Sequence, residues 1–186
     1  MKLIRKILKR LRNSFAGAIP SGWDWTDGNL RVLFVASDKG SPFYYRVLNQ
    51  AEQLSLQHIS HGCRFEWDRS LSSLAEKCDL LYLYRVTSTS QVLKSISIAR
   101  KNGTPVIYDT DDVIWTEKLI EYCQLRSYYS ETEVDAFRAL FQSTEQLMGL
   151  VDSFVTSSDY LAKELVEHFG IPAYVNANAL SQRALA

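Results

Sequence analysis

Short runs of consecutive apolar residues constrain this chain more than any other feature of its sequence. Residues 32–36 and 80–84 are unbroken apolar runs, and residues 105–108 and 153–156 are similar but shorter. A strand with one wet face alternates between apolar and polar residues, whereas a strand buried on both faces reads as a continuous apolar run. The runs therefore predict the strands of a parallel sheet that is covered on both sides.

The segments between these runs have the spacing of amphipathic helices. We expect a weaker strand at 63–67, a short last strand starting at 174–175, and helices near 44–54, 90–101, 117–150 and 159–169. Gly103 and Gly170 stand where two of these helices should end, as glycine often does. Strands that alternate with helices predict an α/β fold with a doubly wound, mostly parallel Rossmann-like sheet, built through right-handed crossovers.

The beginning of the chain has a different character. Six basic residues precede the first acidic residue, Asp24, and apolar residues recur between them at helical spacing over residues 2–15. Such a segment is typical of a helix that lies on an anionic membrane surface, although it could instead pack on the domain or form a tail. We divide the chain into this basic amphipathic helix and a linker (1–29), a Rossmann-like domain (30–180), and a linker or truncated end (181–186).

Charge, hydropathy and cysteine usage exclude several classes of protein. The formal net charge of the 186 residues is zero, which gives no reason to expect a nucleic-acid partner. No apolar run approaches the ~20 residues of a membrane span, and charges interrupt the first segment too often for a secretory signal. The three cysteines are far apart in the sequence, as expected for a reducing compartment. We therefore expect a cytoplasmic protein, peripheral on the inner face of the membrane if residues 2–15 bind there.

Polar residues follow the predicted strands, and parallel α/β sheets bind their ligands beyond the carboxyl ends of the strands. Three carboxylates within four residues, at 109–112, repel one another unless a cation, a donor or water compensates them. The residues expected at this edge are Ser37 to Gly40, Arg85, Asp109, Asp111, Asp112, Ser157, Ser158, Asn176 and Asn178.

The order of elements, together with several short motifs, resembles the retaining nucleotide-sugar glycosyltransferases of the GT-B fold that build bacterial surface polysaccharides. The motifs are Tyr44-Tyr45-Arg46, residues 108–115, Ser157-Ser158 and Asn178-Ala179-Leu180, and the resemblance covers roughly residues 31–180. It implies an N-terminal domain that binds the acceptor, which is a glycan or a lipid-linked sugar. A C-terminal domain with paired glutamates would hold the nucleotide-sugar donor. Nothing in this sequence matches that second domain, so we expect it in cis or in trans.

The resemblance also implies roles for individual residues. Asp109 would be the catalytic carboxylate that orients the acceptor hydroxyl and stabilises positive charge at the anomeric carbon. Gly40 would let the backbone approach the donor phosphates. Arg85 would hold a phosphate or an acidic sugar, or else pair with Asp111 and Asp112. These two aspartates would in turn position the acceptor or cap the next helix. Ser157 and Asn178 are further candidate binding residues, and no cofactor or protein-bound metal is implied.

Aromatic residues and Arg46 carry two interpretations each. Tyr44, Tyr45 and Trp115 could stack on sugar rings or pack in the core, and for Tyr44 the spacing favours the core. Arg46 lies one turn into a helix, where a local ion pair or packing is expected. The histidines are scattered and receive no role, and the cysteines are expected to be buried or inert.

Two other functions remain open at this stage. Residues 106–111 resemble the first motif of haloacid-dehalogenase phosphatases, in which Asp109 would be the nucleophile and Asp111 the acid/base, with magnesium between them. In that family the motif opens the fold, whereas here it follows the fourth predicted strand. The third reading is a non-catalytic glycan-binding or scaffold protein that kept only the acceptor half.

Overall fold

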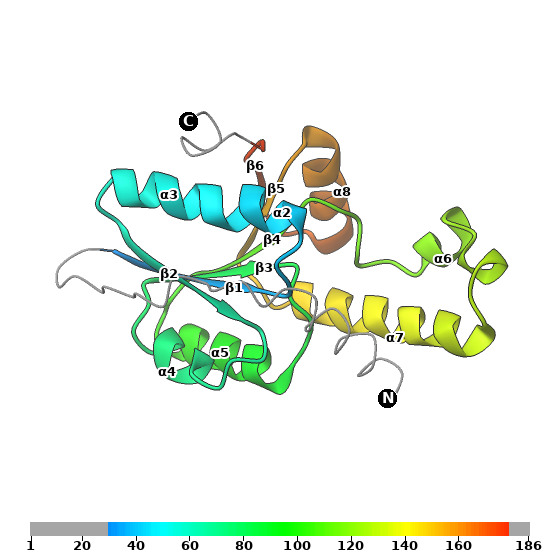
Figure 1. Cartoon of the computed structure of the whole chain (residues 1–186), viewed down its shortest axis with the longest axis horizontal. Helices are drawn as coiled ribbons and strands as arrows, with labels where there is room; N and C mark the ends of the chain where they lie inside the picture. Colours follow the sequence, from blue (N-terminus) through cyan, green and yellow to red (C-terminus); the bar gives the residue numbers. More distant parts are fainter. Residues whose placement is uncertain (1–29, 179–186) are drawn as a thin grey trace.

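Six parallel strands form one sheet in the order β2-β1-β3-β4-β5-β6 (Figure 1). The computed structural model describes residues 30–178, so the predicted helix at 2–15, the linker at 16–29 and the segment 181–186 lie outside the described residues. The strands are β1 Arg31–Ala36, β2 Ser60–Phe65, β3 Leu80–Tyr84, β4 Val106–Thr110, β5 Ser153–Thr156 and β6 Ala173–Val175. All five strand pairs are parallel, which confirms the predicted doubly wound Rossmann-like fold.

The strand order changes direction once, next to β1. The chain passes from β1 outward to β2, returns across β1 to β3, and then continues through β4, β5 and β6. The connections on the two sides of this point leave the sheet toward opposite faces, so the carboxyl ends of β1 and β3 form a topological switch point. In doubly wound sheets this is where ligands bind.

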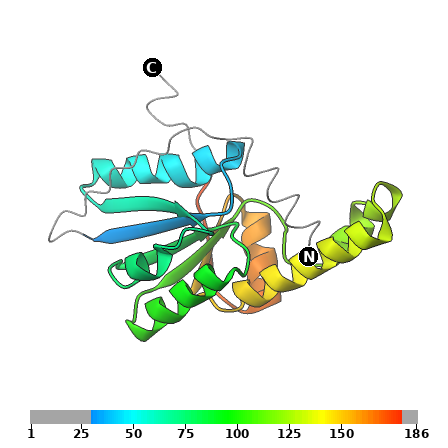
Figure 2. The same cartoon turned by 60° about the horizontal axis from the view of Figure 1, so that its bottom comes forward.

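Helices cover both faces of the sheet. They are α2 Ser41–Phe43, the π-helical η1 Tyr44–Leu48, α3 Asn49–Leu56, α4 Leu71–Ala75, α5 Ser90–Lys101, α6 Lys118–Tyr122, the 3₁₀ turn η2 Leu125–Ser127, α7 Glu131–Met148 and α8 Asp159–Phe169. One apolar cluster joins the sheet to α4, α5, α7 and α8, and a smaller one joins the opposite face to α2, η1 and α3. Figures 1 and 2 show α3 on one side of the sheet and α4 and α5 on the other.

The structure corrects the bounds of one predicted strand and two expectations for the first helix. The weak strand expected at 63–67 is β2, Ser60–Phe65, which lies at the sheet edge and has a mixed burial pattern. The first helix contains a wide π turn, in which the Asn49 N–H donates to the carbonyl of Tyr44 five residues earlier. Tyr44 itself is 57% exposed, so the expected core packing of this side chain is wrong.

The long helical region expected at 117–150 is divided into α6, η2 and α7. Gln124 adopts a left-handed conformation (φ 50°), which ends the first segment. Ser130 then begins α7 with a capping box, in which the Glu133 carboxylate also accepts from the Ser130 N–H. The last turn of α7 packs in the core through Leu147 and Met148, while its first half extends away from the sheet together with α6 (Figures 1 and 2). We call residues 118–141 the arm.

Gly170 provides a test of the predicted helix ends. Its φ of 66° is left-handed, and a Cβ there would meet nothing within 4 Å, so any cost of an added methyl comes from the backbone alone. We expect Gly170→Ala to lower the free energy of unfolding by about 1 kcal/mol.

The matched control is Gly149→Ala. Gly149 has a helical φ of −68°, and its Cβ would make ordinary contacts with two carbonyl oxygens at 3.5 and 3.7 Å. This variant should be neutral or slightly more stable, because alanine restricts the unfolded chain. Urea denaturation of both variants makes the comparison, and equal effects would contradict this explanation.

Candidate functional site at the carboxyl edge of the sheet

The carboxyl ends of all six strands carry polar residues along one edge of the sheet, as predicted. Because the strands are parallel and in register, the residue after each strand lies at this edge. The residues gathered there are Ser37 to Gly40, Glu66, Arg85, Asp111, Asp112, Ser157, Ser158, Asn176 and Asn178, with Asp109 and Thr110 at the end of β4. Sequence reasoning placed all of these except Glu66.

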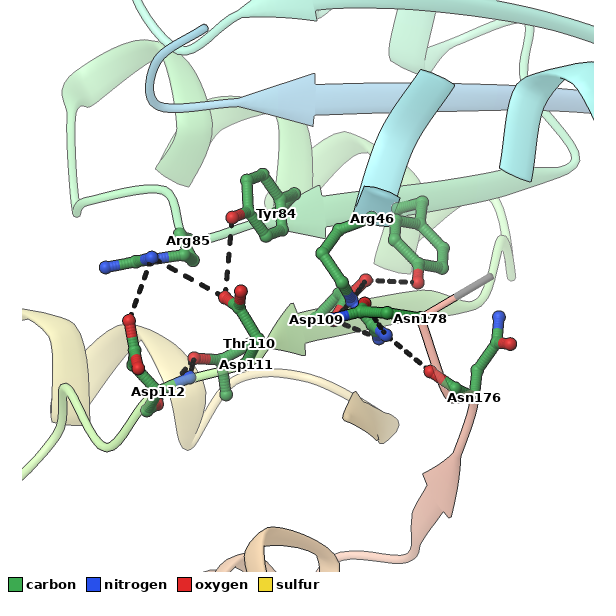
Figure 3. A network of polar contacts seen from close by, with 10 residues as sticks. Arg46, Tyr84, Arg85, Asp109, Thr110, Asp111, Asp112, Asn176 and Asn178 are labelled. Carbon is green, nitrogen blue, oxygen red and sulfur yellow. Dashed lines mark hydrogen bonds and ion pairs between the residues drawn. The ribbon is translucent and has the colours of Figure 1, made fainter. Parts of the chain in front are cut away.

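A buried ion pair between Arg46 and Asp109 lies beneath this edge (Figure 3). Both side chains are 0% exposed, and Arg46 Nη2 and Nε lie 2.7 and 3.0 Å from Asp109 Oδ1. The Tyr82 hydroxyl donates to Asp109 Oδ2 over 2.6 Å. Arg46 therefore pairs with a residue 63 positions away, and the expectation of a local role for it is wrong.

The same arginine holds the chain where it leaves the last strand. Arg46 Nη1 donates to the backbone carbonyl of Asn176 and, over 3.3 Å, to Oδ1 of Asn178 (Figure 3). One guanidinium from η1 thus joins the ends of β4 and β6. Arginine suits this position because its planar group offers five donors in a fixed geometry.

Asp109 is ionised in this network. Burial raises the pKa of Asp109 to about 6, although Arg46 and the Tyr82 hydroxyl both act to lower it. Every contact named above donates to the carboxylate, as expected for the charged form. In this state no face of Asp109 is open to an acceptor, so its influence at the edge is exerted through Arg46 and Asn178.

A second, more exposed cluster surrounds Arg85 (Figure 3). Arg85 Nη1 lies 3.0 Å from Asp112 Oδ2 and 3.5 Å from Asp111 Oδ1, and the Tyr84 hydroxyl donates to Asp111 over 3.4 Å. Of the two roles considered for Arg85, the structure shows the ion pairs with Asp111 and Asp112. Neither aspartate caps a helix: the first residue of α6 is Lys118, and the Asp112 N–H instead donates to the Thr110 hydroxyl.

Arg85 has a strained backbone. Its φ is 47°, a left-handed conformation that is uncommon outside glycine, asparagine and aspartate. Such strain is concentrated at functional sites, where surrounding contacts hold it in place. Here the Arg85 N–H donates to the carbonyl of Asp109, which continues the sheet ladder past the end of β3.

Gly40 and Trp115 have surroundings different from those expected. The Gly40 N–H donates to Asp38 Oδ1 over 2.7 Å, so the amide that was to face the donor phosphates has a carboxylate partner. Trp115 is 3% exposed and packs beside Phe169, so it belongs to the core and offers no face to a sugar. Ser158 caps α8 by accepting from the Leu161 N–H.

Glu66 is the site residue that sequence reasoning missed. It directly follows β2, is 3% exposed, and its Oε2 accepts from both the N–H and the hydroxyl of Thr87. Burial raises the pKa of Glu66 to about 7, against the lowering effect of the two Thr87 bonds. Glu66 was missed because the strand expected at 63–67 contained it, whereas β2 ends one residue before it.

Four further findings concern a buried hydroxyl, metal binding, the cysteines and membrane spans. The buried Thr156 hydroxyl has no hydrogen-bond partner among residues 30–178. Within the same range no three His, Cys, Asp or Glu side chains gather closely enough to hold a metal ion. Of the cysteines, which were expected to be buried or inert, Cys78 is buried, Cys63 is half-buried and Cys123 is exposed. Among residues 30–178 no helix has the length and apolar character to cross a membrane.

Comparison with known proteins assigns the chain to no family. No family model and no curated protein matches it. An ABC transporter solute-binding protein from Bacillus halodurans C-125 with bound myo-inositol is 13% identical, with 87% of this chain and 80% of that chain covered and a TM-score of 0.37.

Two further solved structures are similarly distant. A solute-binding protein from Mycobacterium smegmatis with bound glycerol is 13% identical, with 77% and 71% covered and a TM-score of 0.36. An NtrC family transcriptional regulator from Clostridium acetobutylicum is 12% identical, with 84% and 91% covered and a TM-score of 0.30. Likenesses this low carry no functional argument, and the site is interpreted from its own geometry.

The buried ion pair predicts strong coupling between its members. Removing Arg46 alone leaves an uncompensated carboxylate, which typically costs 3–5 kcal/mol. We expect Arg46→Met and Asp109→Leu each to destabilise strongly. The double variant should be much less destabilised than the sum, because neither charge is then left without its partner. Urea denaturation of the four proteins measures the coupling, and additive effects would show that the pair is energetically unimportant.

Glu66 predicts a pH dependence of stability. Its pKa is about 7 in the folded protein against an ordinary value of 4.5, so the folded state binds more protons between these values. The free energy of unfolding should therefore fall as pH rises from about 4.5 to 7, by at most roughly 3 kcal/mol from this group.

The measurement compares wild type with Glu66→Gln at pH 5 and pH 8. The variant keeps an acceptor for Thr87 but does not titrate, so its stability should gain on that of the wild type as pH rises. Glu76→Gln, at an exposed position, is the control and should follow the wild type. A constant difference between wild type and Glu66→Gln at both pH values would overturn the assignment.

Proposed function

We propose that this chain is the acceptor-side, N-terminal domain of a GT-B-type glycosyltransferase. The observation that supports this most is the gathering of donors and acceptors at the carboxyl edge of a parallel sheet, beside its topological switch point. A sugar acceptor is rich in hydroxyls, and such an edge offers both kinds of hydrogen-bonding partner. The sequence resemblance adds the reaction class, and a donor-binding domain completes the active site.

In this function Arg85, Asp111 and Asp112 are the groups that meet the substrate. Their side chains are 27%, 13% and 60% exposed, so ligand hydroxyls can reach them without opening the core. Carboxylate oxygens accept from hydroxyls, and the guanidinium donates to ring or phosphate oxygens. Ser157, which follows β5 on the same edge, extends this surface, and Gly40 borders it after β1.

Asp109 is buried beneath these groups and acts on the edge through Arg46. Its carboxylate sets the position of Arg46, and Arg46 holds Asn178 in place at the edge. Because the Arg46 guanidinium offsets the charge of Asp109, this carboxylate is a positioning residue in this state of the domain.

The reaction that this domain would serve is a simple group transfer. The bond between the anomeric carbon and the diphosphate of the donor breaks, the acceptor hydroxyl oxygen forms a new bond to that carbon, and the hydroxyl proton is released. The nucleoside diphosphate leaves with the bonding electrons and is stabilised mainly by the second domain. Residues 2–15 would bring the domain to an anionic membrane, where lipid-linked acceptors lie.

The phosphatase alternative fits the geometry less well. It needs Asp109 and Asp111 to share one magnesium ion. In the structure the Asp109 carboxylate is enclosed by Arg46 and Tyr82, whereas Asp111 contacts Tyr84 and Arg85. A nucleophilic aspartate must also reach a phosphorus atom, and Asp109 is fully buried. The geometry therefore favours the glycosyltransferase over the phosphatase.

The test uses the product of the complete reading frame and a panel of nucleotide sugars, with glycan products identified by mass spectrometry. Arg85→Gln should lower kcat/KM by roughly 10- to 100-fold, the scale of one charge-assisted hydrogen bond. Asp79→Asn is the matched control: Asp79 pairs with Arg31 at the opposite edge of the sheet, and its loss should change kcat/KM by less than about twofold.

Thermal unfolding of both variants separates catalysis from stability, since both residues lie at the surface. The absence of transfer from any nucleotide sugar would refute the proposal. Hydrolysis of an aryl phosphate that a chelator abolishes would point instead to the phosphatase. Under this proposal residues 1–186 supply the acceptor side of the site, so on their own they should transfer no sugar.

A further inference from the structure

Four aromatic rings form a continuous strip next to the switch point. Trp67, in the loop after β2, stacks on Phe65 with ring centroids 4.9 Å apart and planes 9° from parallel. The ring centroids of Phe65 and Phe43 of α2 lie 6.1 Å apart, and those of Phe43 and Tyr44 of η1 lie 6.2 Å apart. The two inner rings are buried, whereas Trp67 and Tyr44 at the ends are 42% and 57% exposed.

The ring of Trp67 is partly exposed and is held by the stack on Phe65. An indole has two faces, and Phe65 covers one of them in a nearly parallel stack. The exposed surface of Trp67 therefore belongs to its other face and its edges. A flat, half-exposed aromatic ring whose partner ring is buried is an anchored platform and differs from a freely rotating surface side chain.

The loop that carries Trp67 is held on both sides of the tryptophan. Before it, Glu66 Oε2 accepts two hydrogen bonds from Thr87, and the Glu66 carbonyl accepts from the Thr89 hydroxyl. After it, the Asp68 N–H donates to the carbonyl of Phe65. A ligand that stacks on Trp67 would therefore lose little free energy to ordering the loop.

The charges near the strip balance one another. The loop after β1 contacts the strip through Lys39, whose Nζ lies 5.4 Å from the centroid of the Phe65 ring. In the same loop, the Asp38 carboxylate accepts from the Gly40 amide, which is the group a phosphate would use. The loop thus brings one cation and one anion to the strip and no net formal charge, so a neutral sugar meets no unbalanced charge there.

We propose that Trp67 forms a stacking surface for a neutral pyranose ring of the glycan acceptor. The C–H groups on one face of a pyranose carry partial positive charge, and the face of an indole is negative, so the two attract when stacked. The hydroxyls of the sugar stay at the rim, in water or toward polar groups of the edge. This inference rests on the proposed function and assigns its acceptor a docking position.

The experiment measures binding of the full chain to an array of neutral oligosaccharides, followed by calorimetric titration with the oligosaccharide that binds best. Trp67→Ala should weaken this binding at least tenfold. Trp67→Phe keeps a flat ring and should stay within about threefold of the wild type. Tyr122→Ala removes an aromatic ring that is 86% exposed on the arm, and as the matched control it should leave the affinity unchanged.

Thermal unfolding of each variant shows whether the strip remains folded, and Trp67→Phe keeps the test valid if Trp67→Ala is unstable. Equal affinity of Trp67→Ala and wild type, binding of nucleotides in preference to neutral sugars, or no binding to any neutral oligosaccharide would overturn the inference. Oligosaccharide binding that depends on Trp67, together with no sugar transfer by the complete gene product, would support this site while refuting the proposed reaction.

Discussion

Burial of two opposite charges, on Arg46 and Asp109, constrains the rest of the carboxyl edge. A charge removed from water is tolerated only when it is paired and hydrogen-bonded, so each donor and acceptor around this pair has a fixed position. The Tyr82 hydroxyl on β3 donates to the carboxylate of Asp109. Arg46 in turn donates to Asn176 and Asn178 and so holds the chain against η1 after it has left β6. Three strands and one helix therefore meet at a single guanidinium–carboxylate contact rather than at an apolar junction.

Glu66 plays a comparable part on the other side of β1. Its carboxylate joins the loop after β2 to the loop after β3, and both loops pass the switch point. The edge is thus shaped by two buried acids, one with a cationic partner and one with neutral donors. Burial raises the pKa of both acids, to about 6 for Asp109 and about 7 for Glu66, and in each case the surrounding donors act to lower it. The more exposed groups, Arg85 with Asp111 and Asp112, are arranged on this framework.

The fold was predictable because its strands are buried on both faces, and such strands are recognisable as apolar runs. The edge strand β2 was harder to place, since Ser60–Arg64 has no such run, and the break at Gln124 depends on a backbone conformation that asparagine or glycine would have signalled better. The capping box at Ser130 and Glu133 marks the start of α7, and the single helical region expected at 117–150 did not take it into account. The polar edge followed from topology, but its pairings did not: helical spacing gives no sign that Arg46 reaches Asp109, or that Trp115 faces the core while Trp67 faces solvent.

The π turn at Tyr44–Leu48 makes one point of this helix unusually tolerant of a change in chain length. A π turn holds one residue more than an α turn in about the same rotation, so the helix on its two sides stays in phase. Deleting one residue there would let the segment relax to an ordinary α turn without turning the flanking helix, whereas a deletion from a regular α-helix rotates one side by about 100° relative to the other. Arg46 and Val47 lie within the turn, so their directions toward the sheet depend on the extra residue. A deletion in the turn would therefore alter the ion pair of Arg46 before it altered the packing of α3.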